Sequence, residues 1–289
     1  DIYTAQNGIN YYDAFGENWG PRMDGQNIKQ FNSNGEAVPF TAAPDNFDNF
    51  YRTGVMTSNN IAVSNNSENG DFRLSYTFLD DQSVVPNSGV RRHTVYTSVG
   101  REFLDDKLKI RANIFNIRNK SDNIPNGGYD ESNSVQYGWL WYPRQVGVNE
   151  LKDYWRDGQE GSQQRYVEEL WVNNPWFVVN ENTNSFQENR AIGNVKINYD
   201  ITDKLSVRTR YGVDYKRESR QFRRATSTKA IPGQFGSYRE DEINFQETNA
   251  ELLFTYSNNS DREAKFKYDV KFGGNMMRQA SKTLVANNS

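Results

Sequence analysis

Few residues of this chain have the types and spacing that catalysis requires. The single histidine, His93, has no nearby nucleophile or metal-ligating partner in the sequence, so a solvated or headgroup-level position is expected. The acidic pairs Asp105-Asp106 and Glu168-Glu169 are adjacent in sequence. Adjacent residues on a helix do not face the same direction, and the Asp pair stands in a turn, so neither pair predicts the two carboxylates of a glycosidase. Cysteine is absent, and no phosphate-binding, calcium-binding or zinc-protease motif occurs. The sequence predicts no catalytic residue, no metal site and no cofactor, and therefore no enzyme.

Binding has better candidates, in a tryptophan-rich segment between residues 139 and 176. Flat rings stack on sugar faces or peptide side chains, while amides and guanidinium groups supply hydrogen bonds. Alternatively, these rings form the core of a folded loop, since any such loop needs anchors. Trp155 and Trp171, at helical spacing, are the more structural candidates. The ligand contacts predicted from the sequence are Trp139, Trp141, Tyr142, Arg144 and Trp176.

The elements that position these residues are strands, because from residue 60 onward apolar and polar residues alternate. Only a strand places every second side chain on one face. Clear runs cover residues 72–78, 108–114, 195–201, 205–215, 250–256 and 264–272. Each run has about 8–12 residues, close to the 9–11 that a tilted strand needs to cross a bilayer. We expect about eight such strands in all.

Short and long connections alternate along the chain. The turns at 65–70, 104–107, 202–204 and 258–263 are short, whereas the loops at 82–91, 120–188 and 218–241 are longer. The short turns therefore fall at one end of the sheet and the long loops at the other, as in a transmembrane β-barrel with long outer loops. Helical spacing predicts a short helix at 45–54 and further helical turns near 151–155 and 166–171. The predicted fold class is all-β, part of a large antiparallel transmembrane β-barrel with long, partly helical extracellular loops.

The polar strand faces carry many charges, and these charges indicate which face of the sheet borders water. A Lys or Arg facing lipid at the bilayer midplane would cost about 2–4 kcal/mol. These faces should therefore border a lumen, where pairing with a pore-filling domain is favoured over guidance of substrate. The lumen-facing residues predicted are Arg73, Arg111, Lys196, Arg208, Arg210 and Lys267.

Composition excludes several other classes of protein. The 289 residues carry a formal net charge of -3, which disfavours nucleic acid as a partner. Aromatic residues make up 14%, so simple disorder is not expected although hydrophobic residues reach only 35%. No apolar run approaches the roughly 20 residues of a membrane-spanning helix. The N-terminus lacks the features of a signal peptide, so we expect a protein that is not exported, is mature, or is cut from a longer chain.

Eight short segments, in order along the chain, resemble motifs of the SusC/RagA family of TonB-linked outer-membrane proteins. They are WGPRMDGQ (19–26), FYRTGV (50–55), NIAVS (60–64), FRLSY (72–76), VPNS (85–88), KSDN (120–123), WYPRQV (141–146) and GNV with YDITD (193–195 and 199–203). Three departures stand out: Met23 replaces the usual Leu, Pro143 the usual Gly, and Asn65-Asn66 the usual Gly-Gly.

The resemblance implies a segment of the barrel of an outer-membrane importer of oligosaccharides or peptides. It further implies a SusD-like surface lipoprotein as partner, TonB acting through a plug domain missing from this sequence, and contact with outer-membrane lipid. Residues 1–59 would connect plug and barrel, including the helix at 45–54, and residues 60–289 would supply the barrel strands. Two alternatives stay open: a SusC-like barrel serving as an assembly scaffold, and a soluble carbohydrate-binding β domain.

Overall fold

The computed structural model describes residues 2–4, 10–12, 22–30, 33, 36–165, 172–229, 235–258, 263 and 265–288. Two small antiparallel hairpins come first, β1 (Ile2–Thr4) with β2 (Asn10–Tyr12) and β3 (Asn27–Lys29) with β4 (Ala37–Pro39). Ile28, Phe40 and Met23 pack together beneath the second hairpin. These hairpins lead into the main sheet.

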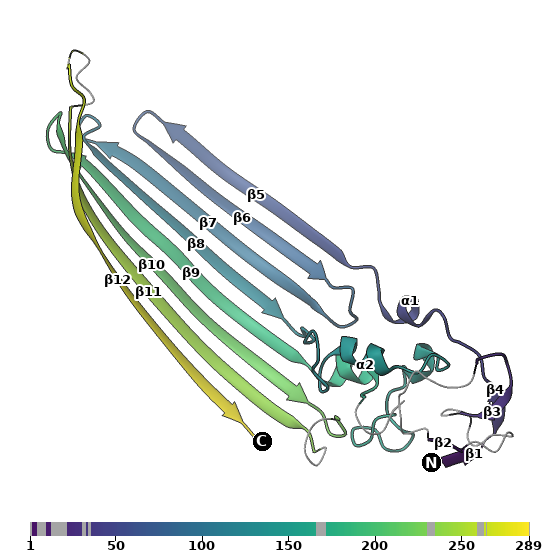
Figure 1. Ribbon diagram of the computed structural model, residues 1–289. Coiled ribbons are helices and arrows are strands. Elements are labelled where there is room, and N and C mark those ends of the chain that lie inside the picture. Colours follow the sequence, from purple (N-terminus) through teal and green to yellow (C-terminus); the bar gives the residue numbers. More distant parts are fainter. Residues whose placement is uncertain are drawn as a thin grey trace.

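One large antiparallel sheet of eight strands dominates the molecule (Figure 1). Its strands follow one another in sequence order from β5 to β12, so every connection joins neighbours. Because β5 and β12 lie at the two edges, the sheet is open. The strands are β5 (Val55–Ser67), β6 (Gly70–Gln82), β7 (Gly89–Phe103), β8 (Leu108–Ser121), β9 (Asn184–Asp200), β10 (Leu205–Arg224), β11 (Ser237–Ser257) and β12 (Asp269–Asn287).

The pairing register gives this sheet one apolar face and one polar face. Residues directly opposite each other in antiparallel strands lie on the same face. One apolar row crosses seven strands through Phe72, Val99, Ala112, Val195, Tyr211, Ala250 and Met276. The adjacent row on the other face runs through Arg111, Lys196, Arg210 and Glu251. The alternation in the sequence therefore predicted the two faces correctly.

Several strands extend beyond the predicted boundaries. The strand β10 continues to Arg224, and β9, β10 and β11 contain 17, 20 and 21 residues. The connections are correspondingly shorter, at 83–88, 122–183 and 225–236. One prediction fails: β12 begins at Asp269, so Lys267 precedes the strand and lies on neither of its faces. Its neighbour Asn258 hydrogen-bonds the backbone of Phe266 and Tyr268, which holds this segment in a turn.

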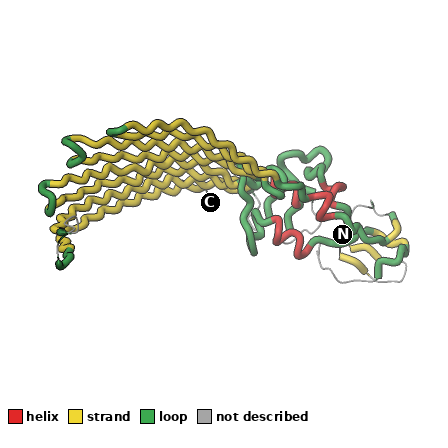
Figure 2. Tube along the Cα trace, turned by 90° about the horizontal axis from the view of Figure 1, so that it is seen from above, coloured by secondary structure: helices red, strands yellow, loops and turns green. Residues whose placement is uncertain are grey.

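Short helices gather beyond the long-loop end of the sheet, where they form a compact cap (Figure 2). We define the cap as residues 122–165 and 172–183 together with α1 (Asn46–Phe50). It contains α2 (Val135–Trp141), the 3-10 turn η1 (Val148–Leu151) and α3 (Pro175–Glu181). The side chains of Ser134 and Asn174 cap the backbone at the starts of α2 and α3.

The cap differs in detail from the helices predicted by sequence spacing. The helix predicted at 45–54 is the five-residue α1, and the helical turn near 151–155 is η1, which ends at Leu151. Trp155 instead forms an isolated bridge with Gln164. The helical turn predicted at 166–171 lies outside the described residues. No helix in the described ranges is long and apolar enough to cross a membrane.

Candidate functional site

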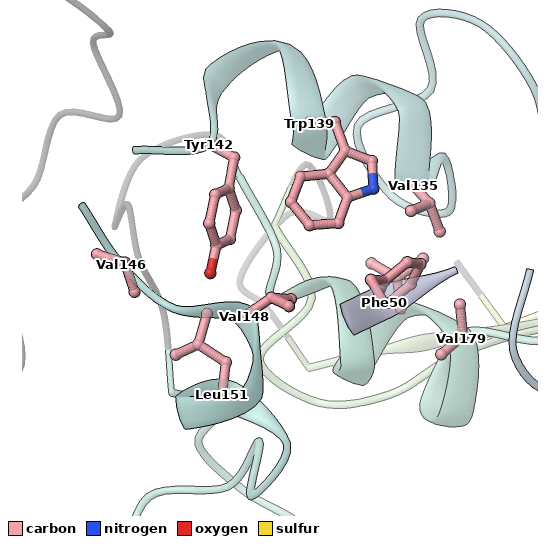
Figure 3. Packing of buried hydrophobic residues seen from close by; sticks show 9 residues of the cluster. Phe50, Val135, Trp139, Tyr142, Val146, Val148, Leu151 and Val179 are labelled. Carbon is pink, nitrogen blue, oxygen red and sulfur yellow. The ribbon is translucent and has the colours of Figure 1, made fainter. Parts of the chain in front are cut away.

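An apolar core holds the cap together, and it draws on residues far apart in sequence. Phe50 from α1 packs against Trp139 of α2 and against Trp176 of α3, with ring centroids 5.4 and 4.8 Å apart. Figure 3 shows Phe50 and Trp139 close to the cluster's valines, among them Val148 and Val179. The buried members are Phe50, Val135, Trp139, Tyr142, Val146, Val148, Leu151, Val178 and Val179. Such a core makes the cap a folded unit rather than a loose loop.

Two of the predicted ligand contacts lie inside this core. Trp139 is 5% exposed and Tyr142 is fully buried, so protein atoms cover both rings. Burial, followed by the nearby charge of Glu150, raises the pKa of the Tyr142 phenol far above its usual value. For these two residues the geometry fits the alternative that the rings form the core of a folded loop. They anchor the cap and do not present a face to solvent.

The other three predicted contacts reach the surface. Trp141 is 40% exposed, Arg144 is exposed and Trp176 is half-buried. The Arg144 guanidinium lies 6.0 Å from the ring centroid of Phe47, which is itself exposed. On the other side, Lys152 Nζ lies 5.2 Å from the ring of Trp176. The cap therefore presents aromatic rings flanked by cations, which suits stacking on a sugar or a peptide.

Buried asparagines organise the backbone of the cap, a feature that the sequence analysis missed. Their shared property is an amide that donates and accepts hydrogen bonds at once without carrying a charge. Asn46, for example, donates to the carbonyl of Val146 (2.9 Å) and accepts from the N–H of Val148 (2.7 Å). The asparagine network comprises Asn46, Asn123, Asn133, Asn173, Asn174, Asn182 and Asn184. The only signal in the sequence is its general excess of asparagine, which does not indicate burial.

This network also joins the cap to the loop between β10 and β11. Asn182 donates to the carbonyl of Ser132 (2.6 Å) and accepts from the Ala225 N–H (3.0 Å) and the Thr228 hydroxyl (2.9 Å). Gln164 donates to the carbonyl of Ser227 at 2.7 Å. Two outer loops that are distant in sequence are thus fixed to each other.

Asp130 anchors the turn before α2 through its charge. Burial raises the pKa of this carboxyl, but hydrogen bonds from Asn126, Ser132 and the backbone of Asn133 outweigh burial, and the pKa ends below its usual value. The carboxylate accepts from the Ser132 N–H at 2.9 Å and from the Ser132 hydroxyl at 2.8 Å. The turn is therefore held by an ionised group.

The polar face of the sheet carries the charges predicted from the sequence. By register, Arg73, Arg111, Lys196, Arg208 and Arg210 all lie on this face. Ion pairs neutralise part of it: Arg111 with Asp71 at 2.5 Å, and Arg208 with Glu251 at 3.0 Å. Arg210 lies 3.9 Å from the same glutamate.

A polar hollow of about 410 Å³ opens near the short-turn end of this face. Arg111 and Lys196 both line it, together with Asp71. Among the described residues, no carboxylate pairs with Lys196 or with Arg73. Within the same ranges, no group of three or more His, Asp or Glu residues could hold a metal ion.

Comparison with known proteins gives partial matches to one class of receptor. No family model matches the chain. The TonB-dependent receptor SusC of Bacteroides thetaiotaomicron is 32% identical over 82 residues, 28% of this chain and 8% of SusC. The TonB-dependent receptor P3 of Formosa agariphila is 20% identical over 190 residues, 64% of this chain and 18% of that receptor.

Solved structures of the RagAB peptide importer share the fold. The open-open state aligns with a TM-score of 0.63 and 14% identity, covering 84% of this chain and 26% of the importer chain. The closed-closed state aligns with a TM-score of 0.64 over 93% of this chain and 28% of the importer chain. The described sheet therefore matches one part of a large transmembrane barrel, and the chain spans under a third of each of these relatives.

These matches confirm the predicted fold class and location. TonB-dependent receptors are outer-membrane proteins and act in transport rather than as enzymes. The open sheet with its exposed apolar face is what a segment of such a barrel requires. An outer-membrane barrel is incompatible with the third alternative, a soluble carbohydrate-binding domain.

Proposed function

This chain corresponds to part of the barrel of a SusC/RagA-family TonB-dependent receptor, and we propose that the whole receptor imports oligosaccharides or peptides. The segment supplies barrel wall, through β5–β12, and part of the outer surface, through the cap. Its polar face borders the lumen, where the charges of Arg73 and Lys196 are available to a plug domain or to cargo.

The observation that carries this proposal is the folded cap at the long-loop end of a two-faced sheet. A barrel wall needs only an apolar and a polar side, but this chain adds a core, an asparagine network and exposed aromatic rings at one end. Loops of this length are usually functional. The exposed rings and cations of the cap, Trp141, Arg144 and Trp176, are the candidate contacts for cargo.

The partner assignments belong to the same proposal. The RagAB structures are those of a peptide importer complex, and the resemblance to RagA suggests a SusD-like lipoprotein seated on the outer loops here too. TonB would act through a plug domain of the whole receptor. Within this arrangement the cap forms part of the receptor surface that meets the lipoprotein and the cargo.

Uptake by cells that produce the full-length receptor tests the transport function. Labelled oligosaccharides and peptides are offered to cells with the receptor, without it, and with the receptor but without TonB. We expect accumulation of one cargo class only when receptor and TonB are both present. Equal accumulation in all three strains, for every cargo offered, would contradict the proposal.

The same strains separate transport from the scaffold alternative. A scaffold predicts no TonB-dependent uptake, together with a stable detergent-resistant complex containing proteins other than a SusD-like lipoprotein. A replacement of Trp141 by Ala adds a second readout, because loss of a stacking ring should raise the cargo concentration needed for half-maximal uptake about tenfold. Its matched control is Tyr129→Ala, an exposed ring elsewhere on the cap.

A further inference from the structure

The outward apolar band of the sheet ends abruptly at basic residues on the long-loop side. On β10 the outward positions run from Leu205 to Tyr215 before the first charge, Arg217. This band covers about 33 Å of strand at ~3.3 Å per residue, or about 25 Å of height at a ~40° tilt, the height of a membrane band. On β8 the first outward charge beyond Ile114 is Arg118, and on β12 the first beyond Met276 is Arg278.

The register places these arginines along one continuous boundary. Arg118 on β8 lies opposite Asn189, which lies opposite Arg217 on β10. On β12 the apolar band ends lower in the register, at Arg278, which lies opposite Thr248. Strands of a barrel tilt, so a level membrane surface crosses successive strands at shifted register positions. The lower register position of Arg278 on β12 therefore fits a single membrane surface that crosses tilted strands, and not a set of scattered charges.

Basic residues outnumber acidic ones along this boundary. We define the cationic belt as Arg91, Arg118, Lys120, Arg217, Arg278 and Lys282. The carboxylates of the same region are Asp80, Asp122, Glu240 and Glu242. Asp80 lies 3.4 Å from Arg91, Asp122 lies 2.9 Å from Lys120, and Glu242 lies 3.5 Å from Arg217.

These three ion pairs still leave the belt with a surplus of positive charge, six cations against four carboxylates. The side chains of Arg91 and Arg217 stay 65% and 64% exposed despite their partners. Among the described residues, no carboxylate pairs with Arg118, Arg278 or Lys282. The belt is therefore both accessible and cationic.

The described residues at the opposite end of the sheet carry no such surplus. Its short turns mix both signs, with Asp105, Asp106 and Asp203 beside Lys107 and Lys204. Only the long-loop end, which faces outward in bacterial barrels, carries the cationic belt. The asymmetry points to a ligand that is anionic and confined to the outer leaflet.

We propose that the cationic belt binds the phosphate groups of lipid headgroups in the outer leaflet of the membrane. The belt directly continues the lipid-facing apolar band, so a lipid whose acyl chains cover Tyr215 brings its headgroup to Arg217. Arginine suits this position because its planar guanidinium binds phosphate through two parallel hydrogen bonds. This proposal depends on the outer-membrane location and not on which cargo the receptor carries.

Lipid retention by the detergent-solubilised full-length receptor tests this assignment. Bis-phosphorylated lipid A and enzymatically dephosphorylated lipid A are titrated separately at low salt with EDTA, and bound lipid is counted by native mass spectrometry. The test variant combines Arg118→Gln, Arg217→Gln and Arg278→Gln. We expect its apparent affinity for phosphorylated lipid A to fall about tenfold to a hundredfold, with no change for the dephosphorylated form.

A charge-matched control removes three cations from the short-turn end, through Lys107→Gln, Lys204→Gln and Lys265→Gln. It should retain phosphorylated lipid A as the wild type does, and both variants should keep heat-modifiable gel migration as evidence of folding. Equal retention by the test variant and the wild type, or an equal loss in the control, would overturn the proposal. Displacement of lipid A by inorganic phosphate at the same phosphate concentration would instead assign the belt to free anions.

Discussion

At the scale of single residues, the cap relies on asparagine where a charged side chain would be costly. A buried charge needs a partner to offset its desolvation, whereas a neutral amide needs only hydrogen bonds. Asn182 and Asn133 satisfy backbone groups of several segments at once, with Asn133 donating to the carbonyl of Asn182 and accepting from the Asn126 N–H at 2.8 Å. The result is a buried, irregular backbone whose N–H and C=O groups find partners in these amides.

Replacing Asn182 by Ala should loosen the junction between the cap and the loop after β10. The change leaves the Ser132 carbonyl and the Ala225 N–H without a partner, at about 1–3 kcal/mol in total. Hydrogen exchange of the full-length receptor should then accelerate in residues 122–134 and 225–229. The exposed Asn149→Ala is the matched control and should leave both segments unchanged. Equal exchange in the two variants would mean that the network does not hold these loops.

The aromatic residues show what spacing alone reveals about a site. An irregular loop has no period, so the sequence identified Trp139, Trp141 and Tyr142 as a cluster without separating buried rings from exposed ones. The separation arises because α2 turns the Trp139 side chain toward Phe50 while Trp141 points away from the core. Phe50 is distant in sequence, and no local pattern connects it to α2.

At the scale of elements, close packing of the backbone governs the pairing of β11 with β12. At Gly273 an added Cβ would lie 2.3 Å from the Leu252 carbonyl oxygen and 2.9 Å from Leu253 Cα. Beside it, an added Cβ at Gly274 would meet nothing within 4 Å. The two adjacent glycines therefore have different roles in the sheet.

Gly273→Ala should weaken the pairing of β11 with β12, and Gly274→Ala should not. A contact with backbone atoms cannot be relieved by a side-chain rotation, so a cost of about 1–3 kcal/mol is expected. The temperature at which the full-length receptor loses its heat-modifiable gel migration measures this effect. A lower transition temperature for Gly273→Ala alone fits the geometry, whereas identical transitions for both variants would refute it.

Strand ends were harder to predict than strand faces. From Glu218 to Arg224 every residue of β10 except Phe222 is polar, so the alternation that marks a half-buried strand disappears while the ladder to β11 continues. Hydrogen bonds of the backbone, not side-chain patterning, sustain this part of the strand. The predicted start of β12 was wrong for the opposite reason: the sequence alternates before Asp269, but the described residues 265–268 have no pairing partner on β11.

At the scale of the whole molecule, the two faces of the sheet impose opposite requirements at neighbouring positions. On β9, Val195 lies on the apolar face and Asn194 on the polar face. Val195→Lys should cost about 2–4 kcal/mol because it places a charge near the bilayer midplane, and Asn194→Lys should be tolerated. Urea unfolding of the full-length receptor in phospholipid vesicles gives both values. Equal destabilisation by the two lysines would disprove the assignment of the faces.

The barrel segment, its family resemblance and a folded, partly helical long loop were accessible from the sequence, whereas the contacts that build the cap were not. Period-two patterning and ordered motifs such as FRLSY report on strands, whose geometry is regular. The cap forms through contacts between α1, the loop after β8 and the loop after β10, whose partners are separated by as many as 102 residues in the sequence. Such contacts depend on strand pairing, which brings these loops to the same end of the sheet.

The polar long-loop ends of β9, β10 and β11 affect how far the molecule projects from the membrane. Beyond Tyr215, nine further residues of β10 continue the wall, about 30 Å of extended chain. This stretch extends the barrel wall above the lipid headgroups on the side of β10. A large particle approaching from outside therefore meets the exposed aromatic rings of the cap before it meets the membrane.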